Sequence, residues 1–389
     1  MAGFATFASL LPGFEAEWHM SHTQAGWINA IYFGGYLFAV LVLTSLTDRF
    51  DPRVIYLICM AVSAVATLGF SLAVGFWSAL FFRSMAGIGL AGTYMPGLKL
   101  LSDLIEGKSQ SRALAFYTGG FGIGSSISYY LTGKVSGVLD WQTTFLLAGI
   151  GPALAFFMVW LMVPGAPPHA DTKARTPMLA DFRRVLHNRN AMGYVMAYAA
   201  HNWELFAMRS WVVAYIVFIQ QWRPSESFPY TAATAAAVIN VVGLPSSVIG
   251  NELCTRFGRP LVVSIIMVVS AGMALSTGFG VMLPPWAVLG FLVLYGVTIM
   301  GESASVTAGA VQAAEPGYRG TTMAVHSSIG FTGAFLGPLV FGMVLDHTGK
   351  GGTPTSWWFA FSSMAAIVAT GPFWLLLFRK KKLVGPETI

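Results

Sequence analysis

The sequence predicts an all-α membrane protein made of two related halves. Its 389 residues are 55% hydrophobic and only 10% charged, whereas about 25% of residues are charged in a typical soluble domain. Residues 54–82 and residues 260–301 contain no charged side chain, and roughly 20 apolar residues form a helix long enough to cross a bilayer. A short basic link at residues 46–53 returns in altered form at residues 253–260, which indicates an internal repeat.

The same composition excludes several classes of protein. The net charge of +6 comes from Lys and Arg residues spread over short links between apolar runs, so it predicts no nucleic-acid partner. Two cysteines, Cys59 and Cys254, are too few for a disulfide framework. The chain has no G-x-x-x-x-G-K-[ST] loop for a nucleotide. We therefore expect no cofactor, no bound metal and no enzymatic activity, with a lipid bilayer as the surrounding medium.

Twelve spans are expected, and the first of them is short. Residues 1–14 are apolar but too few to cross a bilayer, and the matching span of the second half starts near Asn190, which places the beginning of this helix upstream of Met1. We expect a truncated first helix; the alternative is a short re-entrant or interfacial segment. The other spans are expected at approximately 23–46, 54–75, 77–104, 112–133, 142–163, 190–219, 230–251, 260–282, 286–313, 319–344 and 356–378.

Local signals support two of these boundaries. Ser21 and Gln24 have the spacing of a capping box at the start of the second helix. Pro284 and Pro285 mark a turn inside the long apolar run 260–301.

The longest link divides the spans six and six. Apolar residues at helical spacing between 179 and 186 predict a short amphipathic helix on the membrane surface within that link. The expected organisation is an N-terminal six-helix bundle over 1–163, a cytoplasmic linker over 164–189, a C-terminal six-helix bundle over 190–378 and a cytoplasmic tail over 379–389.

The positions of Lys and Arg predict the orientation of the chain. When the six-six link is placed inside, only Lys134, Arg223 and Lys350 fall in outer links, and most other basic residues lie in inner links or the tail. Cytoplasmic links carry an excess of Lys and Arg. We therefore expect a multi-pass protein of the inner (plasma) membrane, with both termini in the cytoplasm, and a monomer.

The two basic links resemble the loop motif of the major facilitator superfamily, which runs approximately Gly-x-Leu-Ala-Asp-Arg-x-Gly-Arg-Arg. The first copy departs from it at Thr44, Asp51 and Pro52, and the second at Asn251 and Thr255. The run from Arg83 to Gly89 is similar to that family's Arg-containing motif of span 4. The matching positions of the two loop copies are Leu46, Asp48, Arg49 and Arg53, and Leu253, Arg256, Gly258 and Arg259.

This resemblance implies a secondary transporter of the same fold, which works by alternating access. It also implies that the loop motif holds the cytoplasmic ends of the bundles together in the outward-facing state. The alternative is that Arg49 and Arg53 only anchor the chain at the membrane and that Asp48 only caps a helix. The residues to which the resemblance gives a gating role are Asp48, Arg49, Arg53, Asp103, Arg83, Arg256 and Arg259.

Charged residues inside the expected spans are the candidates for coupling to an ion gradient. A charged side chain at the centre of a bilayer costs about 2.5–3.5 kcal/mol on insertion scales, so such residues usually have a function. Glu204 lies near the middle of one span with His201 one turn away, and Glu302 lies near the middle of another. In a fold of this family both spans line the central cavity. We expect Glu204, His201 and Glu302 to bind and pass on a proton.

Arg209 lies five residues after Glu204, roughly 140° around the helix, so we expect no tight pair between them. Arg209 could instead meet Glu302 or an anionic solute, and we expect the solute to be an anion. Tyr94, Trp211 and Glu302 are further candidates for contacts with a small organic substrate. The alternative is a static network of Glu204, Arg209 and Glu302 that only joins two spans. A proton-coupled exporter of drugs or amphipathic metabolites, and a sensor on the same fold, also stay open.

Overall fold

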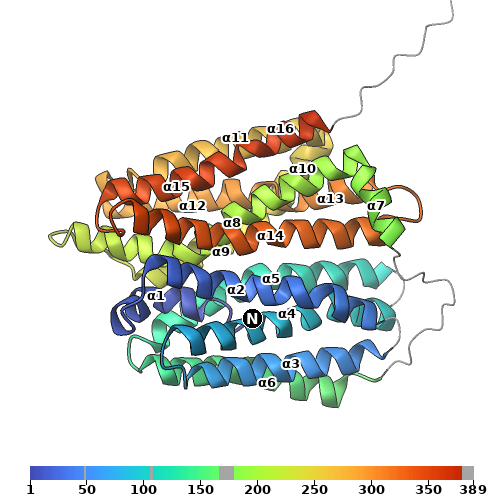
Figure 1. The fold of residues 1–389 in the computed structure, drawn as a ribbon, viewed down its shortest axis with the longest axis horizontal. Helices are drawn as coiled ribbons and strands as arrows, with labels where there is room; N and C mark the ends of the chain where they lie inside the picture. The colour runs from blue at the N-terminus through green and yellow to red at the C-terminus, as the bar shows by residue number, and fades with distance from the viewer. Residues whose placement is uncertain (48–49, 106–107, 166–178, 379–389) are drawn as a thin grey trace, which may run out of the picture.

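The computed structural model describes residues 1–47, 50–105, 108–165 and 179–378. These residues form helices joined by short links, and they contain no strand. Figure 1 shows two groups of helices that lie side by side, with their axes mostly along the long dimension of the molecule. We call α1–α6 the N-terminal bundle and α8–α16 the C-terminal bundle. The prediction of an all-α fold of two bundles is confirmed.

The N-terminal bundle follows the expected spans closely. The capping box is confirmed, because Gln24 Oε1 accepts the Ser21 N–H at 3.0 Å and Ser21 Oγ accepts the Gln24 N–H at 3.2 Å. Asp51 and Asp140 cap the helices that follow them. The helices are α1 Thr6–Glu17, α2 His22–Leu46, α3 Pro52–Phe70, α4 Phe76–Leu104, α5 Lys108–Val135 and α6 Trp141–Met162.

The C-terminal bundle contains more helices than expected spans, because three spans are interrupted. The interruptions fall at Val242, at Glu302 and at Ala369. The elements from the link onward are α7 Leu179–His187, α8 Arg189–Trp222, α9 Ala232–Val241, α10 Gly243–Phe257, α11 Arg259–Thr277, η1 Gly280–Met282, α12 Pro285–Gly301, α13 Ser303–Ala313, α14 Arg319–His347, α15 Pro354–Val368 and α16 Thr370–Leu377.

Each interrupted span is still long enough to cross a membrane as a unit. Among the described residues, eight helical segments have the length and the apolar composition of a span. They are His22–Leu43, Pro52–Phe70, Trp141–Met162, Ala232–Phe257, Arg259–Thr277, Pro285–Ala313, Arg319–His347 and Pro354–Leu377.

Helix α7 lies at the right-hand end of Figure 1, beside the C-terminal bundle. Its Val185 is buried against Met192 and Val195 of α8. The guanidinium of Arg184 donates a hydrogen bond to Glu315 at 2.7 Å, and this bond together with the nearby carboxylate charge raises the pKa of Arg184. Both side chains are exposed, so the pair orients α7 more than it stabilises the fold.

The bundles touch along α2 and α14. Tyr36 of α2 stacks on Phe331 of α14 with ring centroids 4.2 Å apart, and Phe33 lies 4.2 Å from Phe206 of α8. A Cβ added at Gly26 would lie 2.8 Å from the carbonyl oxygen of Pro338, so only a glycine allows this approach. Aromatic rings and close backbone contact thus join the bundles through their middle.

Candidate functional site

Glu204 is fully buried inside the C-terminal bundle. Its Oε1 accepts two hydrogen bonds, from Ser270 Oγ of α11 and from Tyr295 Oη of α12, each at 2.9 Å. Thr298 Oγ1 donates in turn to Ser270 Oγ at 3.2 Å. The second oxygen, Oε2, has no hydrogen-bond partner among the described residues. The carboxyl group therefore joins α8 to two neighbouring helices and keeps one oxygen unpaired.

Glu302 is buried at the interruption between α12 and α13. Its Oε1 lies 3.2 Å from Nδ1 of His201, and neither side chain is exposed. Glu302 also interacts electrostatically with Glu204. The structure therefore brings together the three residues expected to carry a proton, in one buried cluster of the C-terminal bundle.

A stack of rings continues from this cluster. The rings of Tyr198 and His326 lie 4.0 Å apart and nearly parallel, and the ring of His201 lies 6.0 Å from that of Tyr198. His326 Nε2 lies 3.3 Å from Thr307 Oγ1. Tyr198 cannot be selected from the sequence, because tyrosines are numerous and only the fold places this one between two histidines.

Arg209 lies between the bundles. Its Nε donates a hydrogen bond to Asn240 Oδ1 at 2.8 Å, and its guanidinium lies 5.5 Å from the ring centroids of Phe121 and Phe206. Tyr129 of α5 donates a hydrogen bond to the main-chain carbonyl of Arg209. Among the described residues no carboxylate lies within 4.0 Å of Arg209. Its buried positive charge is thus held by an amide and by aromatic rings.

Trp211, another expected substrate contact, is fully buried. Its indole N–H donates to the carbonyl of Pro338 at 2.9 Å, and its ring stacks on Phe341 at 5.4 Å. These contacts pack Trp211, a residue of α8, against α14.

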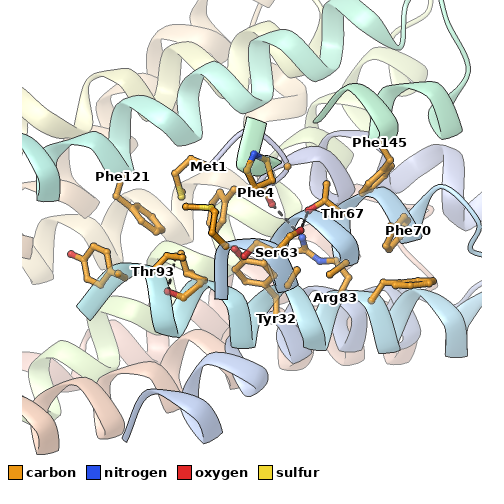
Figure 2. A pocket seen from close by; sticks show the side chains of 18 of the residues that line it. Met1, Phe4, Tyr32, Ser63, Thr67, Phe70, Arg83, Thr93, Phe121 and Phe145 are labelled. Carbon is orange, nitrogen blue, oxygen red and sulfur yellow. Dashed lines mark hydrogen bonds between the residues drawn. The ribbon is translucent and has the colours of Figure 1, made fainter. Parts of the chain in front are cut away.

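Arg83 borders a cavity of about 210 Å³ inside the N-terminal bundle. Figure 2 shows its guanidinium among Tyr32, Phe4 and Thr67. The guanidinium carbon lies 4.3 Å from the centroid of the Tyr32 ring, and Nη1 lies 3.5 Å from the carbonyl oxygen of Phe4. Like Arg209, Arg83 has no carboxylate within 4.0 Å in the described part of the chain.

Tyr94 and Met1 also line this cavity. The ring of Tyr94 stacks on Tyr117 at 6.4 Å. The expectation of a longer first helix stays a prediction.

Of the residues expected to form a gate, Arg53 and Arg259 have side-chain hydrogen bonds in the structure. Asp48 and Arg49 lie outside the described residues. Arg53 donates to the carbonyl of Trp160 at 2.5 Å, and Arg259 donates to Asn251 Oδ1 at 2.9 Å and to the carbonyl of Ser305 at 3.0 Å. Each contact stays within one bundle.

Two further residues expected to form the gate lie at the ends of helices. Asp103 lies in the last turn of α4 and Arg256 in the last turn of α10. A gating role for the whole set stays a prediction.

Solved structures share this fold. The nucleoside transporter NupG is 14% identical and superposes with a TM-score of 0.74 over 98% of this chain and 98% of its own. A bacterial homologue of the human lysosomal transporter Spinster, in an inward-facing and occupied conformation, is 15% identical and has a TM-score of 0.73 over 97% of this chain and 91% of its own.

Curated relatives match part of the sequence. The uncharacterised MFS-type transporter YcaD of Escherichia fergusonii is 32% identical over 154 residues, which are 39% of this chain and 40% of that protein. The YcaD protein of Escherichia coli O45:K1 matches to the same extent. The chain thus spans about two fifths of the length of these relatives. The profile of the Major Facilitator Superfamily, in contrast, matches residues 1–338. The chain belongs to the Major Facilitator Superfamily.

Proposed function

We propose that this protein is a secondary active transporter that moves a small organic anion across the inner membrane by alternating access, coupled to protons. The family, the two-bundle fold and the names of its relatives support membrane transport of a small solute. The bias of Lys and Arg toward the links at the α7 end supports cytoplasmic termini. We propose that a single copy of the chain carries out transport.

The cluster of Glu204, His201 and Glu302 carries the proposal of proton coupling. Three ionisable side chains with no exposed surface lie together in a membrane bundle, where an unpaired charge is expensive. One oxygen of each carboxyl group and Nε2 of His201 have no hydrogen-bond partner among the described residues. Such a group is well suited to take up a proton in one state of the transporter and to release it in another.

Arg209 and Arg83 support an anionic solute. Each arginine is buried, one in each bundle, without a carboxylate nearby in the described part of the chain. The hydroxyl of Tyr129 interacts electrostatically with both guanidinium groups. A buried guanidinium without a counter-ion is costly, and a carboxylate on the solute would supply the missing charge. Arg209 is our first choice because it lies between the bundles.

An exporter of cationic amphipathic compounds is the weaker alternative. It would need Glu204 and Glu302 to face the solute, but both carboxyl groups are buried and bonded within the C-terminal bundle.

The test is uptake into liposomes that contain the purified protein. A panel of small organic acids is offered with and without an inwardly directed proton gradient, beside Glu302→Gln and Arg209→Lys. We expect gradient-driven accumulation of at least one acid, lost in both variants. Accumulation of cations instead of acids, or of acids with equal efficiency in Arg209→Lys, would contradict the anion proposal. Accumulation that ignores the proton gradient would contradict the coupling.

A further inference from the structure

The start of α2 is bound by a residue of the other bundle. Asp346 of α14 accepts hydrogen bonds from the main-chain N–H groups of His22, at 3.1 Å, and Thr23, at 2.8 Å, and from Thr23 Oγ1 at 2.6 Å. The first N–H groups of a helix have no partner within it, and its N-terminus attracts a negative charge. Asp346 therefore caps α2 across the boundary between the bundles, at the left-hand end of Figure 1. We call Glu15, His22, Thr23, Asp346 and Lys350 the end latch.

The ring of His22 is held between two hydrogen-bond acceptors. Nδ1 lies 2.6 Å from Glu15 Oε1, and Nε2 lies 3.0 Å from the carbonyl oxygen of Lys350. A neutral imidazole has only one N–H to donate, and neither an ionised carboxylate nor a carbonyl can donate in return. Both contacts are satisfied only when the His22–Glu15 pair holds one extra proton, which places N–H on both ring nitrogens or O–H on Glu15.

The fold fixes the second acceptor in place. Gly349, Lys350 and Gly351 have φ angles of 116°, 55° and 65°, which only glycine adopts easily. This turn directs the Lys350 carbonyl at the ring of His22, while the next carbonyl, of Gly351, accepts the indole N–H of Trp357 at 2.8 Å. A Cβ added at Gly351 would lie 2.7 Å from His22 Nε2. The carbonyl therefore cannot turn away without rebuilding the turn.

We propose that His22 and Glu15 form a second proton-binding site, separate from the Glu204–Glu302 cluster, and that a proton bound there holds this end of the two bundles closed. When the bundles separate, His22 leaves the Lys350 carbonyl. Nε2 then no longer has to donate to that carbonyl, so the His22–Glu15 pair binds the extra proton less tightly. Closure and protonation therefore favour one another. On the proposed orientation this end faces outward, so acid outside favours the closed end. This last step rests on the proposed function.

The other groups around His22 fit this assignment. From α14, Asp346 adds a negative charge next to the ring but bonds only to the main chain and to Thr23. His347 is exposed and bonded to the carbonyl of Met343. From α8, Trp211 presents its ring, 5.8 Å away, and has no titratable group. The side chains of His22 and Glu15 are 19% and 16% exposed, so a proton can reach them from water.

The test measures the separation of the bundles at this end by electron paramagnetic resonance. Spin labels are attached to Val138→Cys and Met282→Cys, which are exposed on opposite bundles at the latch end, after Cys59 and Cys254 are replaced by serine. The full chain is studied in lipid nanodiscs at about pH 5.5 and about pH 8, on either side of the usual histidine titration. We expect the ratio of closed to open molecules to be several-fold higher at the lower pH.

Three variants separate the parts of the latch. In Glu15→Gln the amide N–H can donate to a neutral ring, so we expect the end to be closed at both pH values. His22→Gln should lose the pH response. Asp346→Asn should lower the ratio of closed to open molecules at both pH values, and that ratio should still be higher at the lower pH. A pH response that persists in both Glu15→Gln and His22→Gln would overturn the proposal, as would a wild type that does not respond.

Glu204→Gln distinguishes this proposal from the proposed function. We expect it to abolish proton-driven uptake and to leave the pH response of the latch intact. If Glu204→Gln also removes the latch response, the second site is not separate and the proposal fails. If uptake proves independent of protons while the latch still responds, only the proposed coupling fails.

Discussion

Asn240 Oδ1 accepts a hydrogen bond from Nε of Arg209 at 2.8 Å and thereby fixes one edge of the guanidinium. Asn240 is itself oriented, because its amide donates to the carbonyl of Ala236 at 2.9 Å. With Nε held by Asn240, the two Nη groups are available for another partner. A guanidinium fixed in this way suits the two parallel hydrogen bonds that a carboxylate accepts.

Arg209→Lys should abolish the stabilisation of the purified protein by an organic acid. A lysine keeps the charge but lacks the planar pair of donors. Asn240→Ala should weaken the effect and lower the free energy of unfolding by about 1–3 kcal/mol, because a buried donor loses its partner. Thermal unfolding with and without the acid measures both effects. Asn251→Ala, which removes a similar bond to Arg259, is the matched control. An equal loss of acid binding in Asn251→Ala would contradict the assignment of Arg209 and Asn240 to the solute site.

Glu302→Gln should separate exchange from accumulation. If the carboxyl group carries the proton, the variant cannot use a gradient, but it can still exchange labelled for unlabelled solute across the membrane. Counterflow and gradient-driven uptake in the same liposomes measure the two processes. Loss of both, with unchanged thermal stability, would show that Glu302 serves solute binding or the conformational change instead.

Gly250→Ala should be strongly destabilising. The added Cβ would lie 1.7 Å from the carbonyl oxygen of Gly301, which is main chain and directly precedes Glu302. Gly272→Ala and Gly290→Ala are matched controls, because nothing lies within 4 Å of a Cβ at either position. Each control should be neutral or stabilise its helix by about 0.5–1 kcal/mol. The measurement is the thermal midpoint of each of the three variants in one detergent. An unchanged midpoint for Gly250→Ala would contradict the close approach of α10 to α12.

Glu315→Gln should loosen α7 without changing the overall stability noticeably. Arg184 loses its charged acceptor but keeps its contact with the ring of Tyr318 at 4.5 Å. Exposed ion pairs contribute little to global unfolding. Hydrogen exchange should accelerate for the amides of α7 while the thermal midpoint stays within error. Faster exchange throughout α8 as well would mean that the pair supports more than α7.

Most of the fold could be predicted from the sequence because a bilayer imposes simple rules. The uncharged runs 54–82 and 260–301 have to become helices in hydrocarbon, where every backbone polar group must be paired within the segment. The interruption at Glu302 was not predictable, since the run 286–313 shows no proline within it. There the close approach of Gly250 to Gly301 accompanies the break, and that contact exists only in the folded bundle.

The candidate site was predicted in its members but not in its geometry. Glu204, His201 and Glu302 could be selected because charge is rare in such spans. Their burial inside one bundle, bonded to Ser270 and Tyr295, depends on how far each helix is rotated about its axis, and a nearly uniform apolar sequence does not determine that rotation. The end latch was missed because His22 and Asp346 are far apart in the chain and each looks like an ordinary residue at the end of a span.

Helix α14 makes close main-chain contacts with both bundles. In its first half a Cβ at Gly333 would lie 2.0 Å from the carbonyl oxygen of Ala199 in α8, and in its second half a Cβ at Gly342 would lie 2.2 Å from that of His22 in α2. Pro338 lies between them and removes one backbone hydrogen bond. A close main-chain contact with each bundle therefore flanks the proline, and a larger residue at Gly333 or at Gly342 would push α14 away from a different bundle.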